Sequence, residues 1–150
     1  MNTSFVTSVA VAPLHAKPIF SSEMVSQSLL WEKMSLLDKN NNWSLVRLVD
    51  GYEGWIHRSF IQNSIYSYDR EIVTTDRNTA VYFKKDDLNS IKYVLSFGTI
   101  IPVVGEDGDF FQIIFPNKEK FFMLKNNFSR IKTRENIIFF SKNLLGVPYL

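Results

Sequence analysis

The sequence has no cysteine among its 150 residues. Disulfide bonds, cysteine-ligated zinc and a thiolate nucleophile are therefore excluded within these residues. No apolar run approaches the roughly 18–20 residues that a membrane-spanning helix needs. The short apolar stretch over 6–11 has no lysine or arginine before it, so it lacks the cationic region of a signal peptide. We therefore expect a cytoplasmic protein with no membrane partner.

Glycine and proline are also scarce, with six and five residues, which argues against a linker-rich or disordered chain. Hydrophobic residues make up 45% of the sequence and aromatic residues 15%, enough for a folded core. The net charge of +2 is too small to indicate a nucleic-acid partner. Residues 117–142 hold seven Lys or Arg and two Glu, a local excess of 7 − 2 = +5, and the ordinary interpretation of such a run is a solvated face.

Short segments rich in β-branched and aromatic residues, bounded by turn residues, fill the region from Trp31 to Ile61. Strands separated by turn signals every 8–12 residues or so indicate a small barrel or sandwich. In this reading Gly54 allows a bend or a close backbone approach, and Trp43 faces Trp55 across a hairpin. The pattern predicts strands over 34–37, 43–48 and 52–57, a polar turn over 38–42, a hairpin turn at Asp50-Gly51, a first strand near 9–11 and a long loop over 21–31.

The same plan recurs after a constant offset of 67 residues. The polar turn over 38–42 corresponds to 105–109, and the hairpin over 49–51 corresponds to 116–118. Apolar positions correspond as well: Leu36-Leu37 with Val103-Val104, Trp43 with Phe110, Val46 with Ile113, Leu48 with Phe115, and Trp55-Ile56 with Phe122-Met123. Two copies of one β unit, joined near 62–71, explain the length better than a single domain.

Residues 134–145 carry an apolar stripe at helical spacing that includes Ile137, Phe140 and Leu144. Thr133 is a suitable N-cap, and Gly146 is a suitable residue to end the helix. We therefore expect a short C-terminal helix. Its apolar face would favour self-association if no other domain covered it.

The two histidines, His15 and His57, fall at predicted strand ends. A metal site needs three or four ligands, so we expect neither a metal nor a cofactor. A triad of Ser59, His57 and Asp50 can be assembled on paper, but Ser and Asp are too common for this to mean anything without geometry. We expect no catalytic residue in the chain.

Several motifs together resemble a known family. "MVSQSLLWEK" over 24–33 and "NNNWSLVRLVDGYEGWIHRSFI" over 40–61 resemble the bacterial SH3-type domain that precedes NlpC-type cysteine peptidases. The resemblance is to the dipeptidyl-peptidases that cut γ-D-glutamyl-diamino-acid bonds in murein peptides. "SFGTIIPVV" and "GDFFQI" are similar to the second SH3-type domain of these proteins, and "IIFFSKNLLGVPYL" is similar to the first helix of the peptidase domain.

The resemblance implies a mainly β fold of two tandem SH3-like barrels, over 1–64 and 65–132, followed by a truncated peptidase domain over 133–150. In the family, W-G-G and D-C-S-G motifs follow that point, so the Cys-His machinery is not among these residues. The implied function is a non-catalytic gating and recognition region of a murein-peptide cysteine peptidase. The alternative is a stand-alone SH3-type module that binds cell-wall peptide or a protein partner.

The resemblance also implies a binding site. The family's acidic residue falls on Glu32 and its aromatic residue on Tyr52. These residues would bind the free N-terminal L-Ala of a murein peptide, because an ammonium group needs an anion and hydrogen-bond acceptors. The other interpretation is a solvated charge and a hairpin packing residue. The sequence departs from the family at Trp31, where glycine is frequent.

Overall fold

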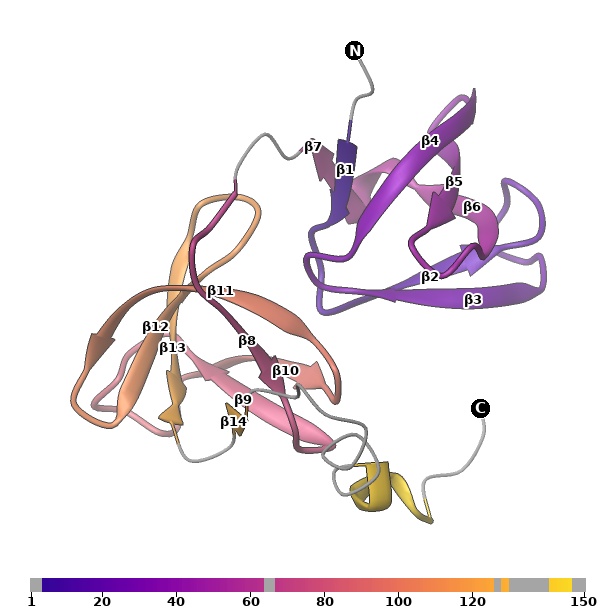
Figure 1. The fold of residues 1–150 in the computed structure, drawn as a ribbon. Helices are drawn as coiled ribbons and strands as arrows, with labels where there is room; N and C mark the ends of the chain where they lie inside the picture. Colours follow the sequence, from indigo (N-terminus) through magenta and orange to yellow (C-terminus); the bar gives the residue numbers. More distant parts are fainter. Residues whose placement is uncertain (1–3, 64–66, 126–127, 130–140, 147–150) are drawn as a thin grey trace.

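The computed structural model describes residues 4–63, 67–125, 128–129 and 141–146. These residues form a mainly β structure of two curled, seven-stranded antiparallel sheets (Figure 1). We call the sheet of β1–β7 the first barrel and that of β8–β14 the second barrel. The fold class predicted from the sequence is confirmed at this level.

The first barrel has the strand order β3-β2-β6-β5-β4-β1-β7. A single 3₁₀ turn, η1 (Arg58–Phe60), separates its last two strands. The strands are β1 (Ser4–Thr7), β2 (Val11–His15), β3 (Met24–Leu29), β4 (Lys33–Asn40), β5 (Trp43–Leu48), β6 (Glu53–His57) and β7 (Ile61–Asn63).

The second barrel repeats this topology, with the strand order β10-β9-β13-β12-β11-β8-β14. Each strand begins 67 residues after its counterpart in the first barrel, so the predicted offset is confirmed in all seven pairs. The strands are β8 (Glu71–Thr74), β9 (Asn78–Tyr82), β10 (Ile91–Ser96), β11 (Ile100–Asp107), β12 (Phe110–Ile114), β13 (Lys120–Leu124) and β14 (Phe128–Ser129).

The backbone irregularities repeat as well. The described residues other than Gly146 that have positive φ form three pairs at the same offset: Trp31 with Gly98, Asn41 with Gly108, and Gly51 with Lys118. The register shift opposite β5 falls at Leu37, and its counterpart opposite β12 falls at Val104. The two copies therefore share their backbone conformation while most of their side chains differ.

Each barrel has its own buried cluster, because alternate residues of its strands point inward. The first cluster contains Ala12, Leu14, Met34, Val46, Leu48 and Ile56. The second contains Ile72, Val81, Leu95, Ile101, Val103, Phe111, Ile113, Phe115, Phe121 and Met123. One residue of the first barrel, Leu30, also belongs to the second cluster and is only 1% exposed. The position of Leu30 joins the two cores.

Four local predictions were wrong. The turn predicted over 38–42 is shorter, because β4 continues to Asn40 and Asn40 pairs with Trp43. Residues 38–42 are exposed, so the strand pairing there leaves no hydrophobic signal. The loop predicted over 21–31 contains β3, and the first strand is β1 rather than 9–11. Trp43 lies opposite His57, whereas Trp55 lies opposite Leu45, so the two tryptophans do not face each other.

Most of the helix predicted over 134–145 lies outside the described residues, and the described part of that range shows no C-terminal α-helix. Within 141–146 the structure has a 3₁₀ turn, η3 (Lys142–Leu144), and Gly146 adopts a φ of 81°. The Arg77 guanidinium donates a hydrogen bond to the Leu145 carbonyl. The boundaries at 64/65 and 132/133 and the self-association of the helix stay predictions.

Gly54 provides a test of close packing in the first barrel. A Cβ atom at this position would lie 2.9 Å from Leu14 Cβ and 3.0 Å from Val25 Cγ2. We expect Gly54→Ala to lower the free energy of unfolding by about 1–3 kcal/mol, as overpacked cores do. Gly105→Ala is the control, because its Cβ would meet only the Gln112 side chain, at 3.3 Å from Oε1. Equal urea-unfolding midpoints for the two variants would contradict this packing.

Glu106 predicts a pH dependence in the second barrel. Hydrogen bonds from Lys125 and Arg70 hold the pKa of the Glu106 carboxyl below its usual value. The folded protein therefore holds a proton on Glu106 less tightly than the unfolded chain does. This contribution to stability is complete above the usual carboxyl pKa and is lost as the pH falls through the lowered value.

The melting temperature of Glu106→Gln should accordingly lie below that of the wild type at neutral pH. The difference should shrink in acid, and calorimetry over the acid range measures it. Glu23→Gln is the control, because Glu23 has no ion pair with the described residues. A constant difference at all pH values would contradict the assignment.

Candidate functional site

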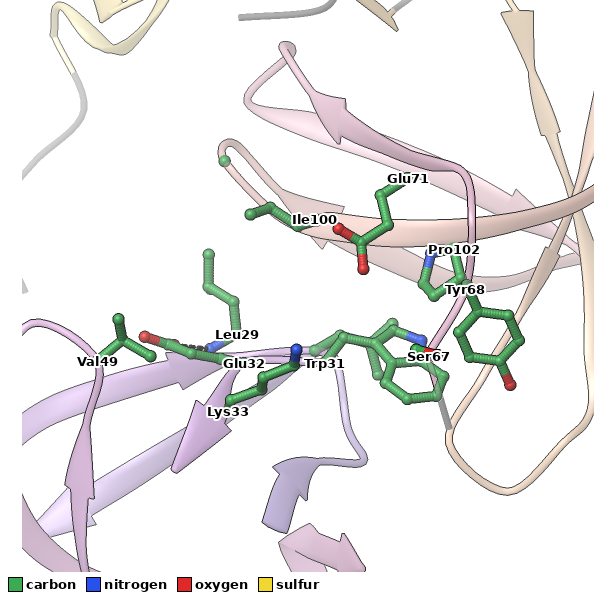
Figure 2. A pocket seen from close by; sticks show the side chains of 12 residues that line it. Leu29, Trp31, Glu32, Lys33, Val49, Ser67, Tyr68, Glu71, Ile100 and Pro102 are labelled. Atoms are coloured by element: carbon green, nitrogen blue, oxygen red, sulfur yellow. Dashed lines mark hydrogen bonds between the residues drawn. The ribbon is translucent and has the colours of Figure 1, made fainter. Parts of the chain in front are cut away.

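A groove of about 590 Å³ lies between the two barrels (Figure 2). The first barrel lines it with Val49 and with residues 29–33, which include the turn between β3 and β4. The second barrel lines it with Gly98, Ile100 and Pro102, and with Ser67, Tyr68 and Glu71 just before and at the start of β8. Most of these side chains are apolar, while Glu32 and Glu71 bring one carboxylate from each barrel. Such a mixed lining is typical of a ligand site.

Backbone hydrogen bonds fix the turn that carries Glu32. Leu30 N–H donates to the Ala10 carbonyl at 3.1 Å and Trp31 N–H donates to the Thr7 carbonyl at 2.9 Å. Glu32 N–H closes the turn on the Leu29 carbonyl at 3.0 Å. Because both flanks of the turn are held, the direction of the Glu32 side chain is set by the fold.

The Glu32 side chain is half-buried and hydrogen-bonded through one of its two oxygens. Oε2 accepts the Leu29 N–H at 2.9 Å and the Ser28 hydroxyl at 3.1 Å. The Ser28 hydroxyl in turn lies 2.5 Å from Thr7 Oγ1, and both of these residues are buried. Since Ser28 donates to Glu32, Thr7 donates to Ser28, and the two hydroxyls orient the carboxylate. Within the described residues these hydrogen bonds all fall on Oε2, which leaves Oε1 for a cationic ligand.

Tyr52 lies in the hairpin between β5 and β6 and is 58% exposed. Its N–H donates to Asp50 Oδ1 at 3.0 Å, and its carbonyl accepts from Leu48 N–H at 2.9 Å. These bonds shape the hairpin and leave the phenol exposed. Val49 of the same hairpin lines the groove, but Tyr52 is not among the lining residues. No hydrogen bond in the described part of the chain joins Tyr52 to Glu32, so their action as a pair stays a prediction.

The two histidines lie at a separate aromatic cluster of the first barrel. The ring centroids of His15 and His57 lie 5.6 and 5.3 Å from that of Trp43. Phe20 packs on Trp43 at 4.7 Å. These contacts account for both rings by packing, and no group of three or more His, Asp or Glu in the described residues could hold a metal ion.

The hypothetical triad of Ser59, His57 and Asp50 is not formed in the structure. Ser59 Oγ lies 2.7 Å from His57 Nδ1, but His57 also accepts the Ser59 N–H, at 3.4 Å, and so caps η1. Asp50 instead accepts from Tyr52 N–H. The contact between the serine and the histidine is therefore a turn cap.

Sequence reasoning missed the second-barrel wall of the groove and the role of the Trp31 indole. Trp31 Nε1 donates to the Ile114 carbonyl at 2.8 Å, across 83 residues of sequence. The sequence did contain a signal for the unusual turn. The offset of 67 makes Trp31 equivalent to Gly98, and a glycine at that position indicates a left-handed backbone conformation, which Trp31 also adopts.

Comparison with known proteins finds a family model that matches part of the first barrel. Residues 14–61 match the family described as the bacterial dipeptidyl-peptidase SH3 domain. The chain is 22% identical, over 149 residues, to a γ-D-glutamyl-L-lysine dipeptidyl-peptidase of Bacillus cereus. That alignment covers 87% of this chain and 45% of the relative, so the chain spans less than half of the relative's length.

The fold is also similar to a solved structure. A crystal structure of an NlpC/P60 family protein from Bacillus cereus ATCC 10987 superposes with a TM-score of 0.78 and 17% sequence identity. The similarity covers 99% of this chain and 65% of that one. In the part of the chain that the structure describes, no helix is long and apolar enough to cross a membrane.

Substitution at Glu32 should separate its structural role from any binding role. Glu32→Ala leaves the Leu29 N–H without its side-chain acceptor, so we expect a loss of about 1 kcal/mol in the free energy of unfolding. Glu32→Thr introduces the residue that occupies the same position in the second barrel, Thr99. There the Thr99 hydroxyl donates to the Ser96 carbonyl at 2.8 Å. We therefore expect Glu32→Thr to be more stable than Glu32→Ala in urea titrations. The reverse order would show that the two turns are not equivalent.

Proposed function

We propose that this chain, whose residues 14–61 form an SH3 domain of the bacterial dipeptidyl-peptidase type, is a non-catalytic recognition region of a cytoplasmic peptidase acting on murein peptides. The printed name of the curated relative, a γ-D-glutamyl-L-lysine dipeptidyl-peptidase, supports this substrate class. Because the sequence contains no cysteine, a thiolate nucleophile would have to come from outside these 150 residues. The contribution of these residues is then binding.

The observation that carries the proposal is the difference between two equivalent turns. Residues 29–32 of the first barrel and 96–99 of the second share three backbone hydrogen bonds, which involve Trp31 and Glu32 in the first turn and Gly98 and Thr99 in the second. In the second barrel, the small residues Gly98 and Thr99 suffice to build this turn. In the first barrel, the same positions hold Trp31 and Glu32, and both line the groove. Turn formation does not require a carboxylate at this position, so its presence in the first barrel favours a binding role.

The chemistry of Glu32 suits a free N-terminal ammonium group. Two hydroxyls and one N–H orient the carboxylate in advance, which lowers the entropy lost on binding. A charge-assisted hydrogen bond from an ammonium to Oε1 would favour peptides with a free amine over blocked ones. The Tyr52 phenol, exposed on the neighbouring hairpin, is the second residue that we assign to the peptide.

A stand-alone binding module is the second candidate. The specific observation in its favour is that each barrel has its own buried cluster, so these residues can fold and bind without a catalytic domain. Binding of murein peptide by the isolated chain with full affinity would favour the module. Weak binding that strengthens when the catalytic domain of the relative is supplied would favour the recognition region.

The proposal predicts amine-dependent peptide binding. We expect L-Ala-γ-D-Glu-L-Lys to shift the ¹H–¹⁵N resonances around Glu32 in a saturable manner, whereas the N-acetylated peptide should not. Glu32→Gln keeps an oxygen acceptor for Leu29 N–H but removes the charge. It should weaken binding about tenfold, which corresponds to roughly 1.4 kcal/mol.

Tyr52→Phe should weaken binding by a smaller factor, because the phenol loses only a neutral hydrogen bond. Glu23→Gln, which removes an exposed carboxylate elsewhere on the first barrel, should leave the affinity unchanged. Equal shifts with the acetylated peptide, or no saturable shift at millimolar concentration, would refute the proposed site.

A further inference from the structure

The turn at Trp31 has an internal reference in the second barrel. Trp31 N–H donates to the Thr7 carbonyl at 2.9 Å, and Gly98 N–H donates to the Thr74 carbonyl at the same distance. The φ angles are 68° at Trp31 and 82° at Gly98. Glycine adopts this left-handed conformation freely, whereas a residue with a bulky Cβ substituent is strained there. The backbone conformation at this position therefore favours glycine, and the first barrel has tryptophan instead.

The strain at Trp31 is offset by contacts with the second barrel. The indole Nε1 donates to the carbonyl of Ile114, the last residue of β12, at 2.8 Å. The indole ring meets Tyr68 edge-on, with a centroid distance of 5.5 Å. Ile114 belongs to the second barrel, and Tyr68 lies in the segment just before its first strand. A glycine at position 31 could make neither contact.

The residue before Trp31 extends the same connection. Leu30 is almost completely buried and packs in the core cluster of the second barrel, with Trp31 and Ala10 against its edge. Neighbouring domains in one chain move relative to each other unless a large apolar interface holds them. Here the side chains of one turn insert into the second barrel, and the indole hydrogen bond gives that contact a fixed direction.

We propose that Trp31 is a positioning residue that locks the two barrels into one unit and thereby fixes the width of the groove and the place of Glu32. Glu32 is the next residue in the chain, so the backbone conformation at Trp31 fixes the position from which the Glu32 side chain extends. The opposite wall, with Glu71 and Ile100, keeps its distance from Glu32 only while the barrels stay together. The locking itself is independent of the ligand; its effect on peptide binding rests on the function proposed above.

Trp31→Gly tests the lock directly. It removes the indole contacts and at the same time relieves the backbone strain, so it should leave each barrel folded. In ¹⁵N relaxation measurements, the wild-type barrels should share one rotational correlation time. In Trp31→Gly we expect each barrel to tumble separately, with a decrease of roughly twofold toward the value of one barrel, as expected of linked domains without a firm interface.

Two further variants separate the components. Trp31→Phe keeps a ring against Tyr68 and loses the hydrogen bond to Ile114, so its correlation times should fall between the other two. Tyr68→Ala loosens the lock from the opposite side and should also shorten them. Asn41→Gly is the matched control, because it relieves a positive φ of 52° at a hairpin away from the junction. It should leave the tumbling unchanged.

A single unchanged correlation time in both Trp31→Gly and Tyr68→Ala would overturn the lock. If Trp31→Gly fails to fold, Trp31→Phe and Tyr68→Ala decide in the same way. Peptide titration separates the two proposals. Separate tumbling together with an affinity loss of fivefold or more by Trp31→Gly, roughly 1 kcal/mol, supports both. Separate tumbling with no peptide binding even by the wild type would leave the lock standing and remove the proposed function.

Discussion

The hydrogen bond from the Trp31 indole to the Ile114 carbonyl is the contact on which the arrangement of the two barrels depends. It joins a strained turn of the first barrel to the end of a strand in the second. Leu30, one residue earlier, is buried in the second core, and Glu32, one residue later, presents its carboxylate to the groove. Three consecutive residues thus link core packing, the fit between the barrels and the candidate binding group.

Because the β unit is duplicated, the second barrel is a reference against which Trp31 and Glu32 of the first barrel can be compared. The two barrels keep the same strand order, the same positions of positive φ and several of the same backbone hydrogen bonds at their turns. Conformation is retained because backbone groups must be paired wherever they are buried. Side chains are free to change as long as the cores stay filled. Where one copy departs from the simplest residue that builds the turn, as at Trp31 and Glu32, the departure indicates a role other than folding.

The sequence predicted the repeat and the hairpin at Asp50-Gly51, because these depend on local pattern and turn chemistry. It did not predict β3, whose serines and glutamine interrupt any hydrophobic pattern although five of its six residues pair with β2. The extension of β4 to Asn40 was missed for the same reason. Solvent-exposed strand pairing leaves little trace in a sequence.

The candidate site was predictable only in part. Glu32 was indicated by family resemblance, and the structure adds that Ser28 and Thr7 orient it. The sequence did not predict the wall formed by the second barrel or the contact between Trp31 and Ile114. Both bring together residues far apart in the chain, and local sequence patterns do not indicate such contacts.

The most direct test is a crystal structure of the chain with L-Ala-γ-D-Glu-L-Lys. The N-terminal ammonium of the peptide should lie within hydrogen-bond distance of the Glu32 carboxylate, with the Trp31 indole still bonded to the Ile114 carbonyl. A peptide bound away from Glu32, or barrels that take unrelated orientations with the groove open, would contradict the proposed recognition unit.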